Sequence, residues 1–210
     1  ENIRRILSRL GEEKNTTPKS LLNEKDFTSA HTGRVMSKLT KIIADLERER
    51  TNLQTIFDAA QVGMLLINEN TEVTHANRVV EQLVGKKMAD LFSLQPGDSL
   101  GCANGASVAQ GCGHAEACHS CPMRNTFERV LHTGQEIWGA EAEMRLIING
   151  EERKFCFSVC ATRLVLNAAK HVLITLSDIT DRKRMEEALR HSEERYRTIL
   201  KTAMNGFWLV

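Results

Sequence analysis

A short internal repeat places the strongest constraint on how this 210-residue chain can fold. Residues 53–67, LQTIFDAAQVGMLLI, align with residues 196–210, YRTILKTAMNGFWLV, at an offset of 143, with identical residues at five positions. A repeat at a fixed spacing indicates a recurring structural unit. The unit consists of a helix followed by a domain. We therefore expect one domain at residues 62–180 and the truncated start of a second domain at residues 203–210.

Two helices with coiled-coil character are expected to flank this domain. In residues 35–61, apolar side chains alternate in steps of four and three, with Glu49 filling one position of the stripe: Val35, Leu39, Ile42, Leu46, Leu53 and Ile56. Such a heptad pattern favours pairing with another helix. The same stripe, shifted by the repeat offset, predicts a second linker helix at residues 181–202. Residues 1–34 are predicted as a short helix, with Ile3, Ile6, Leu7 and Leu10 on one face, followed by a polar connector from residue 15 to residue 31.

Between these helices the pattern is typical of an α+β domain with an antiparallel sheet. VGMLLINEN and TEVTHA predict two strands, and Asn77 is a good cap residue for the helix RVVEQLVG that follows. MADLF predicts a further short turn of helix. PMRNTFERVLHTG predicts a helix with proline in its first turn and glycine after its end. EIWGAEAEMRLII, RKFCFSVCATRLVL and HVLITLSDI predict three more strands, separated by turns.

Composition excludes several classes of protein. The 28 basic and 27 acidic residues nearly cancel, and the basic residues form no dense run, so no nucleic-acid partner is indicated. No apolar segment reaches the roughly 18 to 20 residues that cross a bilayer, so we expect no membrane contact in this chain. Six cysteines are too few for a secreted disulfide scaffold, which favours the cytoplasm.

Three stretches resemble PAS domains of bacterial multi-domain sensor proteins: TIFDAAQVGMLLIN, ANRVVEQLVG and SDITDRKRMEEALRHSEERYRTIL. In the last stretch, Asp178, Ile179 and Thr180 precede a charged helix, as at the typical exit of a PAS/PAC module. The resemblance covers roughly residues 50–210. It implies a five-stranded antiparallel sheet that holds a small-molecule pocket, with signal transmission through Asp178, Ile179 and Thr180 into the linker helix.

The same resemblance implies what the parent protein does. The chain is expected to be the sensory input module of a sensor histidine kinase in a two-component system, with no catalytic activity of its own. It would detect a small ligand or a redox or oxygen state, and would act as a homodimer joined through the linker helices, with an effector domain beyond Val210. A diguanylate cyclase or a transcription regulator is the alternative effector.

A cysteine-rich insertion at residues 96–121 departs from an ordinary PAS domain. It holds four cysteines among several glycines: Cys102, Cys112, Cys118 and Cys121. Ordering a long glycine-rich loop costs about 1 to 2 kcal/mol per residue, and the segment offers little apolar surface in return. A Cys-x2-Cys pair with two further thiolates would complete a four-sulfur shell, so we predict a metal centre, either zinc or an iron–sulfur cluster. His114 and His119 are substitute ligands.

Thiol chemistry is the competing interpretation of this segment. Cys118 and Cys121 stand at the start of a predicted helix, where the helix dipole lowers the pKa of a thiol, so the pair is a candidate thiol–disulfide site. The alternating strand–helix pattern of a thioredoxin-like domain is missing, however. A third possibility is a purely structural role for unligated thiols. Cys156 and Cys160 lie four apart on one predicted strand face, where packing is favoured.

Overall fold

The computed structural model describes the backbone of residues 19–207 and the side chains of residues 31–200. The chain divides into two units, residues 1–55 and residues 56–210. The first described element is helix α2, Lys19–Ala59. The predicted helix around Ile3 to Leu10 lies outside the described residues. The predicted connector at residues 15–31 is wrong from Lys19 onward, because α2 already begins there. No proline or glycine lies between Lys19 and Thr32, so nothing local stops the helix.

The apolar stripe of α2 remains exposed to solvent. All six apolar side chains at the predicted heptad positions are more than 40% exposed, Leu46, Leu53 and Ile56 among them. Asp45 and Arg48 form an ion pair on the same helix, with 3.6 Å between Oδ1 and Nη1. Since a long exposed apolar stripe is costly in water, the helix retains a surface suited to a partner helix.

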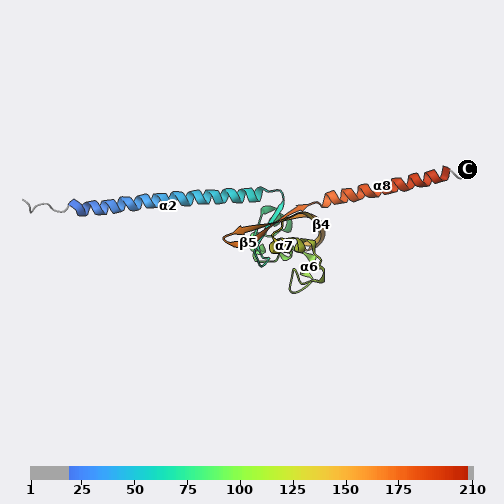
Figure 1. Cartoon of the computed structure of the whole chain (residues 1–210), viewed down its shortest axis with the longest axis horizontal. Coiled ribbons are helices and arrows are strands. Elements are labelled where there is room, and N and C mark those ends of the chain that lie inside the picture. Colours follow the sequence, from blue (N-terminus) through green and yellow to red (C-terminus); the bar gives the residue numbers. More distant parts are fainter. Residues whose placement is uncertain (1–18, 208–210) are drawn as a thin grey trace, which may run out of the picture. The chain divides into compact units, whose positions relative to one another are not determined.

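The second unit contains an antiparallel sheet of five strands, as predicted (Figure 1). The strands are β1, Gly63–Ile67; β2, Val73–Ala76; β3, Ile137–Ile148; β4, Glu151–Leu166; and β5, Ala169–Asp178. Their order across the sheet is β2-β1-β5-β4-β3. The first and last strands of the domain therefore pair in the middle, where Leu65 is opposite Ile174. This α+β fold is the one expected from the sequence.

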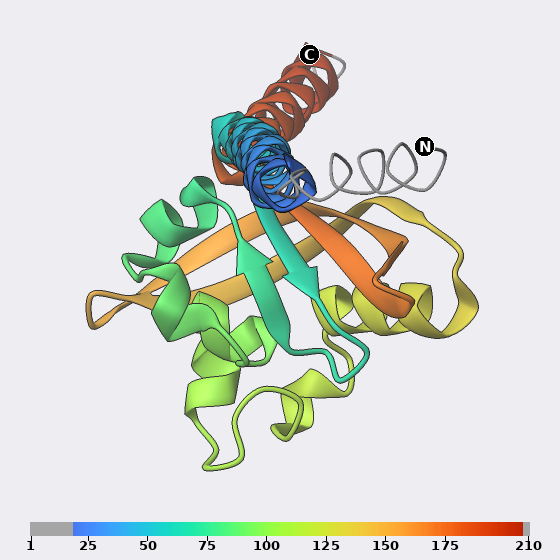
Figure 2. The same ribbon diagram turned by 90° about the vertical axis from the view of Figure 1, so that its left-hand side faces the viewer.

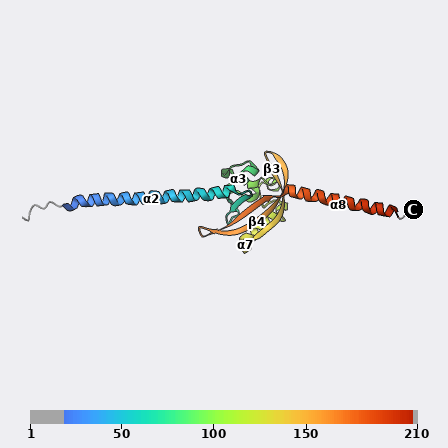
Figure 3. The same ribbon diagram turned by 90° about the horizontal axis from the view of Figure 1, so that it is seen from above.

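Helices cover the inner face of this sheet (Figure 2). They are α3, Arg78–Val84; α4, Met88–Leu91; α5, Pro96–Leu100; α6, Ala103–Ala106; the short 3-10 helix η1, Glu116–Cys118; and α7, Pro122–Thr133. Helices α3 and α7 lie over different parts of the sheet (Figure 3). The chain leaves the sheet through α8, Thr180–Phe207, which is longer than the predicted helix at residues 181–202.

Side chains fill the space between this sheet and its helices. Phe127 of α7 and Phe157 of β4 are each 1% exposed and belong to the same apolar cluster as Leu65, Leu100 and Ile174. Burying a large apolar side chain stabilises a fold by roughly 1.5–3 kcal/mol. The core therefore holds the sheet and helices together as one body, and a change at one strand is felt by its packed neighbours.

The cysteine-rich insertion differs from the predicted irregular loop. It contains α5, α6 and η1, and Leu100 is fully buried while Cys102 and Cys118 are nearly so. Helices of three to five residues leave no periodic pattern in a sequence, since tertiary contacts rather than propensity hold them. The packing of this segment against the core therefore offsets part of the conformational entropy that is lost when it becomes ordered.

Candidate functional site

The exit from the sheet into α8 is built by three consecutive residues, Asp178, Ile179 and Thr180. Asp178 Oδ1 accepts hydrogen bonds from the backbone N–H and the hydroxyl of Thr180. The Thr180 hydroxyl oxygen accepts a bond from the backbone N–H of Cys156 at 2.9 Å, and the Ile179 N–H donates to the Cys156 carbonyl at 2.8 Å. The start of α8 is therefore bonded directly to strand β4, and Ile179 is buried beside it.

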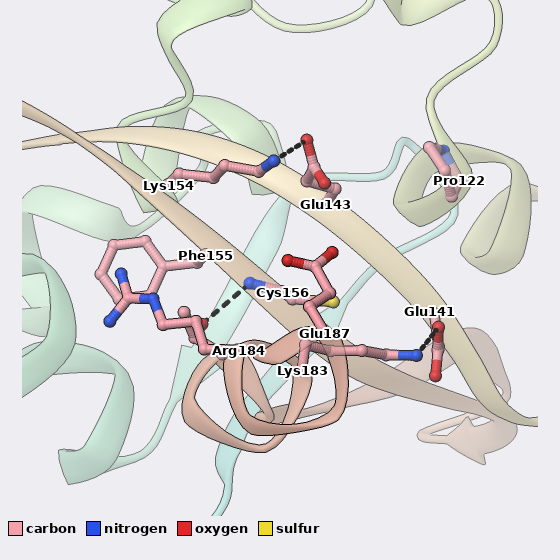
Figure 4. Close-up of a pocket in the computed structure, with 10 residues that line it drawn as sticks. Pro122, Glu141, Glu143, Lys154, Phe155, Cys156, Lys183, Arg184 and Glu187 are labelled. Atoms are coloured by element: carbon pink, nitrogen blue, oxygen red, sulfur yellow. Dashed lines mark hydrogen bonds and ion pairs between the residues drawn. The ribbon is translucent and has the colours of Figure 1, made fainter. Parts of the chain in front are cut away.

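Charged side chains reinforce this junction (Figure 4). Lys183 Nζ of α8 lies 2.7 Å from Glu141 Oε2 of β3, and Arg182 Nη2 lies 3.8 Å from the same carboxylate. The hydrogen bond that the Lys183 ammonium donates to the Glu141 carboxylate raises the pKa of Lys183 above its usual value. Between β3, β4 and the first turns of α8 lies a cavity of about 500 Å³, whose lining includes Glu143, Lys154 and Cys156.

Asn77 organises the junction where α2 leads into β1. Its side chain is fully buried and makes four hydrogen bonds. The amide nitrogen donates to the carbonyls of Phe57 at 3.2 Å and Val62 at 2.9 Å. The amide oxygen accepts from the N–H groups of Met64 at 2.9 Å and Val80 at 3.3 Å. The predicted helix cap is confirmed, and the same side chain also fixes the last turn of α2 to β1.

Local contacts link the four cysteines of the insertion pairwise. A Cβ atom built on Gly97 would lie 2.5 Å from Cys112 Sγ and 3.5 Å from Cys102 Cβ, so these two cysteines flank the same glycine. Gly113, which follows Cys112, donates its N–H to Cys118 Sγ at 3.4 Å. Cys118 and Cys121 are joined by a backbone turn. All four thiols are free.

The comparisons with known proteins identify the domain. Residues 51–114 match the family model of the PAS domain. The chain contains a PAS domain. No curated protein matches the sequence. The match begins in α2 and ends inside the cysteine-rich insertion, so strands β3 to β5 complete the PAS sheet beyond the matched residues.

Several solved structures are similar to this PAS domain. One is the PAS domain of nitrogen regulation protein NR(II) from Vibrio parahaemolyticus, with 13% identity, a TM-score of 0.43, and coverage of 60% of this chain and 96% of that one. Another is a PAS domain from a two-component sensor histidine kinase, with 10% identity, a TM-score of 0.43, and coverage of 63% and 97%. A third is an RNA-binding light-oxygen-voltage receptor, with 15% identity, a TM-score of 0.48, and coverage of 69% and 37%.

Two charged residues that sequence reasoning missed hold the insertion of this PAS domain in place. Asp98 Oδ1 accepts the N–H of Cys112 at 2.8 Å. Arg124 of α7 donates from Nη2 to the carbonyl oxygen of Cys112 at 3.3 Å and to its Sγ at 3.6 Å, and pairs with Glu128 through Nη1. Burial raises the pKa of the Cys112 thiol, against the opposing effect of Arg124. In the sequence, Asp98 lies four residues before Cys102, and Arg124 lies three residues after Cys121. This spacing alone does not indicate which cysteine either residue contacts.

The candidate ligands differ in their exposure. His114 and His119 are exposed, whereas the four cysteines are buried or half-buried. Within residues 31–200, no three cysteine, histidine or acidic side chains already surround a common point. Cys118, the attacking thiol in the competing interpretation, is buried, which disfavours thiol–disulfide exchange with large substrates. Among residues 19–207, no helix has both the length and the apolarity needed to cross a bilayer.

Proposed function

We propose that this chain is the sensory input module of a cytoplasmic signalling protein, and that α8 carries its output to a histidine kinase effector domain. The observation that carries the proposal is the bonding of Thr180 and Ile179 to Cys156 of β4. Strand β4 is a central strand whose inner face is packed into the PAS core. A change in the core that moves β4 would therefore move the first turn of α8.

The two kinds of contact at the junction determine how α8 would move. The hydrogen bonds to Cys156 fix the position of residue 180, and the Lys183–Glu141 pair fixes one face of α8 toward β3. A shift of β3 against β4 would pull these two attachments in different directions. The simplest response is a rotation or tilt of α8, the kind of small helix movement by which packed proteins pass signals between domains.

A second copy of the chain is the proposed partner of both linker helices. The exposed apolar side chains of α8, including Met185, Leu189 and Tyr196, repeat the heptad stripe of α2 at the offset of 143 residues. In a parallel, in-register pair of α2 helices, Asp45 and Arg50 lie on opposite edges of the seam, five residues apart, where coiled coils form ion pairs between helices. This charge pattern supports a parallel homodimer. We further propose that a second PAS domain follows at residues 203–210 and beyond.

The test is a register series in the full-length parent protein. One residue inserted between Arg182 and Ser192 rotates everything after it by about 100° relative to the sheet. Seven inserted residues lengthen the helix but restore the phase of the heptad stripe. We expect the single insertion to abolish the response of the effector to its signal and the seven-residue insertion to preserve it. Equal signalling by both variants and the wild type would contradict a relay through α8.

A further inference from the structure

Two of the four sulfur atoms of the cysteine-rich insertion, those of Cys112 and Cys118, accept hydrogen bonds. Gly113 donates its N–H to Cys118 Sγ, and Arg124 donates Nη2–H to Cys112 Sγ. Gly97 makes a further backbone hydrogen bond with the Cys112 thiol. Donors of this kind stabilise a sulfur that carries negative charge, as a metal-bound thiolate does. The surroundings of these sulfurs therefore suit metal-bound thiolates.

Arg124 supplies positive charge beside the same cysteines. Its side chain is 16% exposed, and its Nε atom is buried with no hydrogen-bond partner among the described residues. A buried guanidinium with an unsatisfied donor is costly unless negative charge lies close to it. Glu128 provides one such charge. Four thiolates around a divalent cation carry a net charge of about minus two, which would give Arg124 a second counterion.

The packing of the insertion limits the size of what it can hold. A Cβ atom on Gly97 or Gly113 would lie 2.5 Å from a neighbouring side-chain atom, and one on Gly111 would lie 2.7 Å from Asp98 Oδ2. A single zinc ion is bound by sulfur atoms at about 2.3 Å. An iron–sulfur cube has eight core atoms, and beside Cys112 it would have to displace the closely packed backbone of Gly97. The crowding favours one ion over a cluster.

We propose that Cys102, Cys112, Cys118 and Cys121 bind one zinc ion in a structural tetrathiolate site, with Arg124 outside the ligand shell as its charge partner. Binding replaces the four thiol protons by Zn²⁺ and turns the sulfurs toward a shared centre beside Gly97. The exposed histidines, His114 and His119, take no part. Metal content is measured on the protein itself, so the zinc site is tested independently of the signalling relay.

Metal analysis of the full chain, purified without oxygen, tests the proposal. We expect one zinc per chain and no iron or acid-labile sulfide. Titration of the metal-free wild type with Co²⁺ should give the strong sulfur-to-cobalt absorption of a tetrathiolate, which reports the ligands without any variant. Serine at any one of the four positions should weaken Zn²⁺ binding at least tenfold, and Arg124→Gln should weaken it roughly 10- to 100-fold, as outer-shell changes do.

Matched controls lie elsewhere in the chain. Cys156→Ser and Cys160→Ser on β4 remove the two remaining cysteines and should leave one zinc per chain, as should the double change of His114 and His119 to alanine. Iron with sulfide would overturn the single-ion site. Loss of zinc in the histidine variant would overturn the four-cysteine ligand set. Wild-type protein that neither contains zinc nor binds Zn²⁺ or Co²⁺ would overturn the proposal as a whole.

Discussion

At the scale of single residues, a few polar side chains connect parts of the PAS domain that are distant in sequence. Asn77 was predictable as a helix cap from its place before RVVEQLVG. Its bonds to Phe57 and Val62 were not, because a sequence does not say which carbonyls a folded chain brings near an amide. Asp98 and Arg124 were missed for the same reason: their function depends on where the backbone of Cys112 lies.

Replacing Asn77 tests its role as a connector. Asn77→Ala leaves two N–H groups and two carbonyls without their partner, so we expect a loss of about 2 to 4 kcal/mol in the free energy of unfolding, more than loss of a helix cap alone. Urea unfolding followed by circular dichroism measures it. The exposed residue Asn70 is the matched control, and Asn70→Ala should change stability by less than about 0.5 kcal/mol. Equal effects of the two changes would refute this role.

At the scale of secondary-structure elements, the sequence predicted the long regular segments and missed the short ones. The alternating and apolar runs predicted all five strands, and a proline and a glycine marked the ends of α7. Helices α5, α6 and η1 were missed because their contacts, such as the burial of Leu100, are tertiary. The start of α2 was placed too late because polar composition was taken as a sign of irregular structure. In a helix without proline, polar residues are ordinary on a solvated face.

The attachment of α8 to β3 predicts a dependence on pH. The Glu141 carboxylate raises the pKa of Lys183 above 10.5, so the ion pair contributes fully below the ordinary lysine pKa and is lost as pH rises through the raised value. The difference in urea midpoint between wild type and Lys183→Met should therefore stay constant from neutral pH to about pH 10 and shrink above it. About 1 M salt should also reduce it, since the pair is partly exposed. A difference unchanged at alkaline pH would argue against this ion pair.

At the scale of the whole molecule, the resemblance to PAS domains predicted a small-molecule pocket and a signal exit at residues 178–180, which local patterns did not indicate. Periodicity indicated strands and helices, but the sheet order, with β1 and β5 paired at the centre, follows from long-range pairing. That order explains the proposed relay. The strand that precedes α8 lies between β1, which follows α2, and β4, which is bonded to the start of α8. Input and output helices thus connect to neighbouring strands of one sheet.

Hydrogen exchange in the first turns of α8 tests the coupling of the PAS core to its output helix most directly. Val159→Ala loosens the buried face of β4, and Val84→Ala is a matched truncation in α3. We expect the amides of residues 181–187 to exchange faster in Val159→Ala but not in Val84→Ala. Thr180→Val, which removes the hydroxyl bonded to Cys156 but keeps the Ile179 bond, should make their exchange less sensitive to Val159→Ala. Unchanged exchange in Val159→Ala, or the same increase in both truncations, would contradict a relay from β4 to α8.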